Sequence, residues 1–247
     1  RVYQAELGIV SGIEAFGAAA AALKPPAVIR WRDWAKAARA DYEAFVRPVA
    51  VKGAVNPSEI FAWLNERLPE DAIFTNGAGN YAGWLHRFHL HRRFNTQIAP
   101  TSGAMGYGVP AAIAAKAVHP DRVVIACAGD GCFLMSGQEL ATAVQYGLNV
   151  VFLVFNNGMY GTIRMHQERE YPARVVATEL KNPDFAAYAK SFGCWSATVR
   201  TTAAFAPAFE EALAAGRPAL IEIVTEPDVI SPTATLSGIR KAAQNKI

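Results

Sequence analysis

Apolar runs separated by glycine, proline and asparagine predict an alternation of strands and helices along most of the chain. Residues 122–128 (RVVIACA) and 149–155 (NVVFLVF) are apolar and β-branched, which is typical of strands buried on both faces. Residues 136–146 between them have helical character, and Gly147 supplies a stop. The segment therefore predicts a β-turn-α-β unit whose two strands lie parallel in one sheet.

The same alternation continues on both sides of this unit. A helix start is predicted at Asn56, which can cap, with Pro57 in the first turn and Glu59 completing a capping box. Strands are also predicted near Ile73, near Trp195 and at Ala219–Val224, and helices from Met105, Pro183 and Thr202. The fold class expected is α/β, a doubly wound and mostly parallel sheet with helices on both faces.

Both ends of the chain differ from this pattern. An Ala-rich helix is expected from Gly12, and Pro25-Pro26 ends it. Residues 31–45 form an amphipathic helix of mixed charge, of the kind that bridges domains. The tail at 231–247 is polar and basic, which leaves two alternatives, a segment folded over a neighbouring site or a disordered one.

Oxygen-bearing side chains follow the two central strands. Because parallel strands end at one edge of a sheet, Asp130 and Asn157 are expected to lie together there. Hard divalent cations prefer such carboxylate and amide oxygens, and a sharp exit at Gly158 would leave the Met159 carbonyl as a third ligand. Gly131 lets backbone approach an anion, and amides at the next helix start can donate to phosphate. The spacing predicts a metal-bridged diphosphate site.

With these motifs the chain resembles the thiamine diphosphate-dependent 2-oxo acid decarboxylases and carboligases, such as acetolactate synthase and benzoylformate decarboxylase. The signature of that family is a GDG followed by an NN, here at 129–131 and 156–157. Three further stretches look like its carboxyl-terminal cofactor-binding domain: TSGAMGYGVPAAIAA, MSGQELATAVQYGLNV and NPDFAAYAKSFG. The resemblance covers residues 56–232.

The resemblance implies thiamine diphosphate and Mg²⁺ as cofactors. Asp130, Asn157 and the Met159 carbonyl match the metal ligands, and Asn80 and Tyr81 stand where acetolactate synthases have a Gln-His pair on the diphosphate. Met105 matches an apolar residue under the bent cofactor, and the Gly103 carbonyl an acceptor for its pyrimidine amino group. The cofactor-binding set implied is Gly77, Asn80, Tyr81, Gly103, Met105, Gly129, Gly131, Cys132, Asn157, Met159 and Tyr160.

The resemblance also implies a domain organisation. Residues 1–30 match the end of a middle domain, 31–52 a linker helix, 53–230 the diphosphate-binding domain and 231–247 a tail. In the family a glutamate on an amino-terminal, pyrimidine-binding domain of a partner subunit activates the cofactor, so this chain alone is expected to be an inactive part of a lyase or transferase. A homodimer or homotetramer is expected, and FAD in the middle domain stays open.

The residues after the NN motif bear on the substrate. Acetolactate synthases carry Gly-Met-Val and then a Trp there, whereas this chain has Gly161-Thr162-Ile163 and then His166. The string NNGMYG is closer to the decarboxylase branch. His166 is a candidate substrate contact or acid/base group, with an exposed helix histidine as the alternative. The substrate is expected to be a small 2-oxo acid that the sequence does not name.

Charge and composition argue against nucleic-acid-binding, membrane-spanning and disulfide-rich secreted proteins. The net charge is +3, but no acid occurs from Ala72 to Pro120, where basic residues favour an anionic ligand. The window lacks the dense basic-aromatic pattern of nucleic-acid binders. No apolar run is long enough for a membrane span, and no secretory signal opens the chain. Three cysteines are too few for a disulfide framework, which favours a cytoplasmic location.

Two other functions remain open at this point. Gly77, Gly79 and Gly83 form a weak relative of the dinucleotide-binding fingerprint of NAD(P) oxidoreductases, although the acid it requires is missing. A non-catalytic module that binds the cofactor is the second alternative. His86, His89 and His91 have a spacing that fits no zinc motif, so they are expected to be surface or interface groups.

Overall fold

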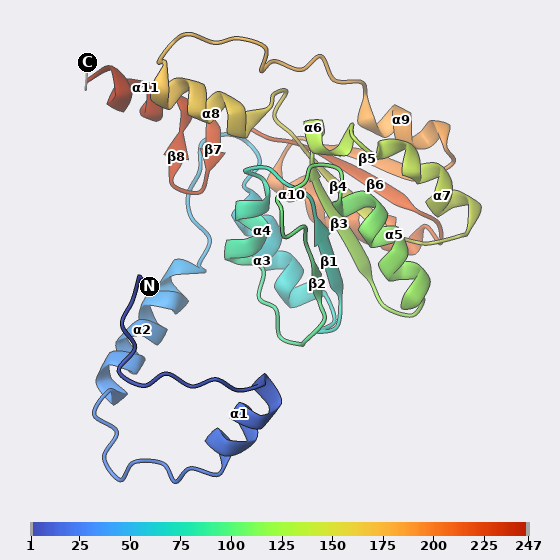
Figure 1. The fold of residues 1–247 in the computed structure, drawn as a ribbon. Helices are drawn as coiled ribbons and strands as arrows, with labels where there is room; N and C mark the ends of the chain where they lie inside the picture. The colour runs from blue at the N-terminus through green and yellow to red at the C-terminus, as the bar shows by residue number, and fades with distance from the viewer. Residues whose placement is uncertain (1, 246–247) are drawn as a thin grey trace. The chain divides into compact units, whose positions relative to one another are not determined.

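The computed structural model describes residues 2–245, and the chain divides between Ala44 and Phe45 into two units. The first unit holds α1 (Ile13–Ala21) and almost all of α2 (Arg32–Phe45), which match the two helices predicted there. The second unit contains every strand of the described chain and is the part of the molecule that builds the site (Figure 1).

A parallel sheet of six strands forms the centre of the second unit. Its strands are β1 (Ile73–Asn76), β2 (Gln97–Ile98), β3 (Val124–Gly129), β4 (Val151–Asn156), β5 (Trp195–Val199) and β6 (Ala219–Val224). They lie in the order β2-β1-β3-β4-β6-β5, and all neighbours run parallel. The predicted α/β fold with a doubly wound sheet is confirmed.

Helices cover both faces of the sheet (Figure 1). The helices before the carboxyl-terminal segment are α3 (Pro57–Arg67), α4 (Ala82–Phe88), α5 (Gly108–Val118), α6 (Asp130–Phe133), the 3₁₀ turn η1 (Gly137–Glu139), α7 (Leu140–Gln145), α8 (Gly161–Glu170), α9 (Phe185–Ser191) and α10 (Thr202–Ala214). Right-handed crossovers put α5, α7 and α9 on one face and α4 and α10 on the other, where α3 packs against both. All strands therefore end at one edge.

The start of α3 follows the predicted capping, with one difference. The Asn56 side chain accepts a hydrogen bond from the Ser58 amide, and Pro57 occupies the first turn. Glu59 receives the Asn56 side-chain amide at 2.8 Å instead of the Asn56 backbone N–H. That backbone N–H is already used, because it donates to the Thr202 hydroxyl at 2.8 Å. The cap thus ties α3 to the start of α10.

Two predicted helices differ from the structure in ways that glycines explain. The helix expected from Met105 begins at Gly108, because Gly103 and Gly106 have positive φ angles of 66° and 80° that a right-handed helix does not contain. The single helix expected over 136–146 is divided into η1 and α7. Gly137 packs there against the ring of Phe133, 2.7 Å from where its Cβ would lie.

Residues 229–244 of the carboxyl-terminal segment form regular elements, in keeping with a folded tail. β7 (Val229–Ser231) and β8 (Ala234–Thr235) form an antiparallel hairpin, and α11 (Leu236–Gln244) follows and packs on α8 (Figure 1). Thr235 caps α11 by accepting the Gly238 amide at 3.1 Å. Among residues 2–245, no helix combines the length and apolarity needed to cross a bilayer.

Candidate functional site

The ends of β3 and β4 meet around the carboxylate of Asp130. Gly129 pairs with Phe155 in register, so Asp130 and the turn at 157–158 follow neighbouring strands. Asp130 Oδ2 accepts the Gly158 amide at 2.8 Å, and Oδ1 accepts the Gly131 amide at 2.9 Å. The expected meeting of the GDG and NN segments is therefore present at one sheet edge.

The Asp130 carboxylate is 2% exposed and is surrounded by N–H donors. Burial raises the pKa of this carboxyl above its ordinary value, and hydrogen bonds from Gly131, Asn182, Gly158 and Met159 act in the opposite direction. Loss of water therefore outweighs the donors. A cation bound beside this group would stabilise its charged form, because a buried carboxylate needs an opposite charge.

The turn after β4 presents two further oxygen atoms. Gly158 has a φ of 72°, which gives the sharp exit predicted from the sequence. Asn157 Oδ1 accepts the Met159 amide at 3.2 Å. The Met159 carbonyl accepts no hydrogen bond from any of residues 2–245, whereas the carbonyl of Gly158 accepts the Leu180 amide at 2.9 Å. One carboxylate, one amide oxygen and one free carbonyl form a donor set suited to a hard divalent cation.

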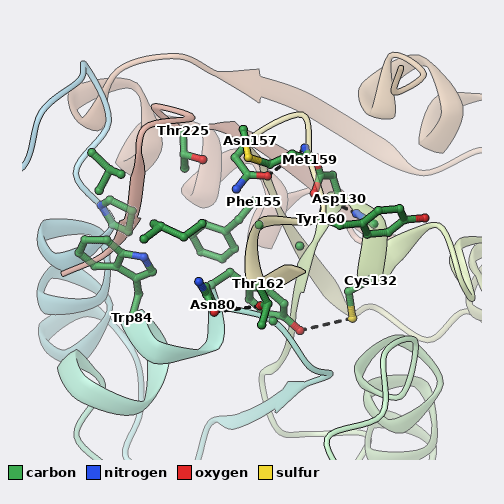
Figure 2. A pocket seen from close by; sticks show the side chains of 18 of the residues that line it. Asn80, Trp84, Asp130, Cys132, Phe155, Asn157, Met159, Tyr160, Thr162 and Thr225 are labelled. Carbon is green, nitrogen blue, oxygen red and sulfur yellow. Dashed lines mark hydrogen bonds between the residues drawn. The ribbon is translucent and has the colours of Figure 1, made fainter. Parts of the chain in front are cut away.

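A cavity opens beside these groups, and most of the predicted residues line it (Figure 2). They are Asn80, Tyr81, Met105, Gly129, Asp130, Gly131, Cys132, Asn157, Met159 and Tyr160. Gly77 and Gly103 line an adjoining cavity that shares Ala78, Gly79 and Asn80 with the first. His166 lines neither cavity and is exposed on α8. Ten of the expected positions are thus brought together by the fold.

Tyr81 and Cys132 use their polar atoms within the protein. The Tyr81 hydroxyl accepts the Gly77 amide at 2.9 Å and lies 3.5 Å from Cys132 Sγ, the contact drawn as a dashed line in Figure 2. Cys132 Sγ accepts the Gly106 amide at 3.2 Å. Burial raises the pKa of Tyr81 well above its ordinary value. Both side chains therefore join the loops of the cavity to each other.

Asn80 keeps a donor for a ligand. Its Oδ1 accepts the Thr162 hydroxyl at 2.9 Å (Figure 2), which fixes the orientation of the amide. Its Nδ2 contacts only a weak acceptor, the Met165 sulfur at 3.6 Å. The Asn80 amino group can therefore exchange this contact for a phosphate oxygen at little cost.

Two aromatic rings pack directly against the glycines of the GDG motif. A Cβ on Gly131 would lie 2.6 Å from the Tyr160 ring, and one on Gly129 would lie 2.9 Å from the Tyr81 ring. Gly131 was expected to allow close approach of an anion. The structure adds that the Tyr81 and Tyr160 rings contact the turn that holds both glycines. The turn is consequently held between the Tyr81 and Tyr160 rings, with no space for larger residues at Gly129 and Gly131.

Comparisons with known proteins show the family of the chain. A family model described as the carboxyl-terminal TPP-binding domain of thiamine pyrophosphate enzymes matches residues 77–223, more than half of the chain. The chain belongs to the thiamine pyrophosphate enzyme family. This membership removes the dinucleotide-binding oxidoreductase as an alternative.

Relatives in the thiamine pyrophosphate enzyme family include acetolactate synthase large subunits. That of Corynebacterium glutamicum is 34% identical over 70% of this chain and 29% of its own length, and that of Parasynechococcus marenigrum is 39% identical over 58% and 23%. The solved thiamine diphosphate-dependent 4-hydroxybenzoylformate decarboxylase of Rhodococcus jostii RHA1 has a TM-score of 0.68 and 32% identity, over 74% of this chain and 34% of that one. The chain spans about a third or less of the length of these relatives.

Several residues that line the cavity of this thiamine pyrophosphate enzyme were not predicted. Trp84, Phe155 and Ile230 form an apolar wall, and Thr225 adds a hydroxyl. Thr162, which lies in the stretch already linked to the substrate, adds another; Figure 2 labels Trp84, Phe155, Thr162 and Thr225. Phe155 ends a predicted strand, so its position was a usable signal. Trp84 and Ile230 lie in segments for which no element was predicted, and only the tertiary fold brings them here.

The three histidines of α4 and the following loop do not form a metal site. Within the described part of the chain, no group of three or more His, Cys, Asp or Glu is placed to hold an ion. His86 and His91 are exposed, whereas His89 is half-buried with its ring centroid 4.0 Å from that of Phe74. Burial lowers the pKa of His89 to about 3, so it stays neutral at physiological pH.

Proposed function

We propose that this chain supplies the thiamine diphosphate- and Mg²⁺-binding domain of a 2-oxo acid decarboxylase or carboligase. The observation that carries the proposal is the meeting of Asp130 with the turn after β4, 2.8 Å from the Gly158 amide, inside one cavity. Family membership supports the cofactor, and the oxygen donor set supports the metal.

Each group of the cavity has a role in this proposal. Asp130, the Asn157 side chain and the Met159 carbonyl would hold Mg²⁺, while the Asn80 amino group and the Cys132 amide would bind the diphosphate. Gly131 would let the diphosphate approach the backbone closely, because its own N–H donates to Asp130 Oδ1. Gly103, Met105 and Tyr160 complete the proposed cofactor contacts. Thiamine diphosphate, when bound, supplies an electron sink for loss of carbon dioxide from a 2-oxo acid.

The apolar wall bears on the kind of substrate. Phe155 and Ile230 line the cavity together with Trp84, so water is excluded from the part of the site they cover. A 2-oxo acid with an apolar or aromatic side chain fits such a wall. The small hydroxyl-bearing Thr162 replaces the methionine of acetolactate synthases, which favours the decarboxylase branch.

Partners follow from the same proposal. The activating glutamate would come from an amino-terminal domain of a partner subunit, which makes a homodimer or homotetramer the working form. Cys127, Cys132 and Cys194 are free and buried, in keeping with the cytoplasmic location expected from the sequence.

Chelation provides the first test. Thiamine diphosphate binding by the complete enzyme is expected to weaken on the order of 100-fold, or about 2.8 kcal/mol, when EDTA removes divalent metal. The reason is that the diphosphate then faces the buried Asp130 carboxylate without a bridging cation. Isothermal titration with and without Mg²⁺ measures the effect, and equal affinities in the two titrations would contradict the metal assignment.

Turnover distinguishes an enzyme from a non-catalytic module. The complete enzyme, supplied with both cofactors, is expected to release carbon dioxide from at least one member of a panel of aliphatic and aromatic 2-oxo acids. Tight cofactor binding with no release from any member would favour the non-catalytic module. The same panel ranks aromatic against aliphatic substrates and so tests the role of the apolar wall.

A further inference from the structure

We propose that Asn182 is a positioning residue that holds the Asp130 carboxylate for the metal through an amide bridge between the ends of β3 and β4. This inference rests on the proposed function. Asn182 lies in the loop before α9 and is not among the residues that line the cavity. Its Nδ2 donates to Asp130 Oδ2 at 2.8 Å and to Asn156 Oδ1 at 2.9 Å. Both N–H bonds of the amino group are thereby used.

The orientation of the Asn182 amide is fixed by what surrounds it. If the amide were turned over, Asn182 Oδ1 would face a carboxylate oxygen and the Asn156 carbonyl oxygen, so three acceptors would meet without a proton. In the observed orientation Asn182 Oδ1 is buried and has no hydrogen-bond partner among residues 2–245. A bare buried oxygen is costly. An apolar side chain would avoid that cost, so the two donated hydrogen bonds are the reason for an amide here.

Asn156 is itself anchored in the sheet. Its Nδ2 donates to Glu222 Oε1 at 2.7 Å, and the Thr198 hydroxyl donates to Glu222 Oε2 at 2.9 Å. Glu222 is buried in β6, between β4 and β5. A continuous chain of hydrogen bonds therefore runs from Thr198 on β5 through Glu222, Asn156 and Asn182 to Asp130 at the end of β3.

This chain of hydrogen bonds gives the carboxylate a rigid support. The Gly131 and Gly158 amides belong to the two turns that hold the proposed ligands, so they move when the turns move. Asn182 instead connects Asp130 to hydrogen-bonded side chains on three neighbouring strands of the sheet, β4, β6 and β5. Groups that orient a metal ligand from behind contribute to metal affinity even though they never touch the ion.

Replacing Asn182 by leucine removes both donors and keeps the approximate shape. We expect the dissociation constant for Mg²⁺, titrated calorimetrically into the complete enzyme with saturating thiamine diphosphate, to rise about 10–100-fold. The thermal unfolding temperature of the metal-free protein is measured alongside, because a purely structural role would lower it without changing the metal constant.

Asn65→Leu is the matched control. Asn65 makes two comparable part-buried bonds, donating to the Phe88 carbonyl at 2.7 Å and accepting the Leu90 amide at 2.9 Å, away from the cavity. We expect a similar loss of thermal stability in this variant and no change in the Mg²⁺ constant. The milder Asn182→Ser, whose shorter side chain cannot span both acceptors, is expected to weaken Mg²⁺ binding in the same direction.

The outcomes separate the two levels of the proposal. If the unaltered enzyme shows no Mg²⁺-dependent cofactor binding, the proposed function itself fails. If that binding is present and folded Asn182→Leu or Asn182→Ser keeps the original Mg²⁺ constant, the positioning role is overturned. An equal rise of the constant in Asn65→Leu overturns it as well. If Asn182→Leu does not fold, the Asn182→Ser titration alone decides.

Discussion

Replacing Asp130 by alanine is expected to reduce Mg²⁺-dependent thiamine diphosphate binding by more than about 100-fold. The change removes the one charged protein ligand proposed for the metal and leaves the donors from Gly131, Gly158 and Asn182 without their acceptor. Isothermal titration of cofactor at fixed Mg²⁺ measures the affinity, and activity on the preferred 2-oxo acid is expected to fall with it.

Two companion variants make the result specific. Asp184→Ala removes an exposed aspartate that caps α9 through the Ala187 amide at 2.8 Å; it is expected to cost about 1 kcal/mol of stability and no cofactor affinity. Asp130→Asn keeps the shape of the side chain but loses the charge, and should behave like alanine. Unchanged cofactor affinity in Asp130→Ala would refute the metal site.

The central β-turn-α-β unit could be predicted from sequence because its signals are local. β3 and β4 are buried, β-branched runs, and β6 occupies the predicted Ala219–Val224. Gly147, with a φ of 61°, marks a stop, and Asn56 carries its own cap. Since parallel strands share an edge, the meeting of Asp130 with the turn after β4 followed from two short motifs.

Elements without such local signals were not predicted. β2 is a two-residue edge strand, too short for any alternation to be visible. α4 begins at Ala82, and its N-cap Tyr81 makes no side-chain capping bond; histidines and arginines interrupt the apolar pattern of this stretch. The hairpin of β7 and β8 is also short, although Thr235 before Leu236 was a usable capping signal for α11.

Within the site, sequence reasoning found the groups that follow strands and missed those that act from a distance. Asn182 is separated from Asp130 by η1, α7, β4, α8 and the loop that follows, and its sequence context, Asn before Pro, is ordinary for a helix start. The roles of Tyr81 and Cys132 in joining loops depend on side-chain orientation, which residue type and spacing do not determine.

A buried ion pair connects α11 in the tail to α8, whose first residues line the cavity. Glu168 on α8 has no exposed side-chain surface; it accepts Arg240 Nε from α11 at 2.7 Å and Arg164 Nε at 2.9 Å. α8 begins at Gly161, where a Cβ would lie 2.8 Å from Ile230 Cδ1 of β7. Ile230 of β7 is therefore packed at the start of α8, and Arg240 of α11 is bound near the end of α8, so Glu168 helps to hold the residues that line the site.

The Arg240 guanidinium beside Glu168 is the main cause of a pKa of about 2 for that carboxyl, against 4.5 ordinarily, and burial opposes it. A depressed pKa contributes stability at pH above 4.5, which is lost as pH falls toward 2. The shift corresponds to about 3 kcal/mol, an upper value because Arg240 is 37% exposed and partly screened.

Glu168→Gln is accordingly expected to lower the free energy of unfolding of the chain by about 2–3 kcal/mol at neutral pH, because two guanidinium groups lose their partner. Urea unfolding should show a lower midpoint with an unchanged slope.

Glu210→Gln is the control, because it breaks an equally bidentate pair with Arg67 at the surface. The Glu210 and Arg67 side chains are 45% and 42% exposed, so this variant is expected to lose less than about 1 kcal/mol of stability. The loss of unfolding free energy in Glu168→Gln should become smaller as pH falls from 5 toward 3. In that range the Glu168 carboxyl is increasingly protonated in the unfolded chain, so its charged, paired form stabilises the folded chain less. A pH-independent deficit, or equal losses in the two variants, would mean that the pair does not clamp α11 to α8.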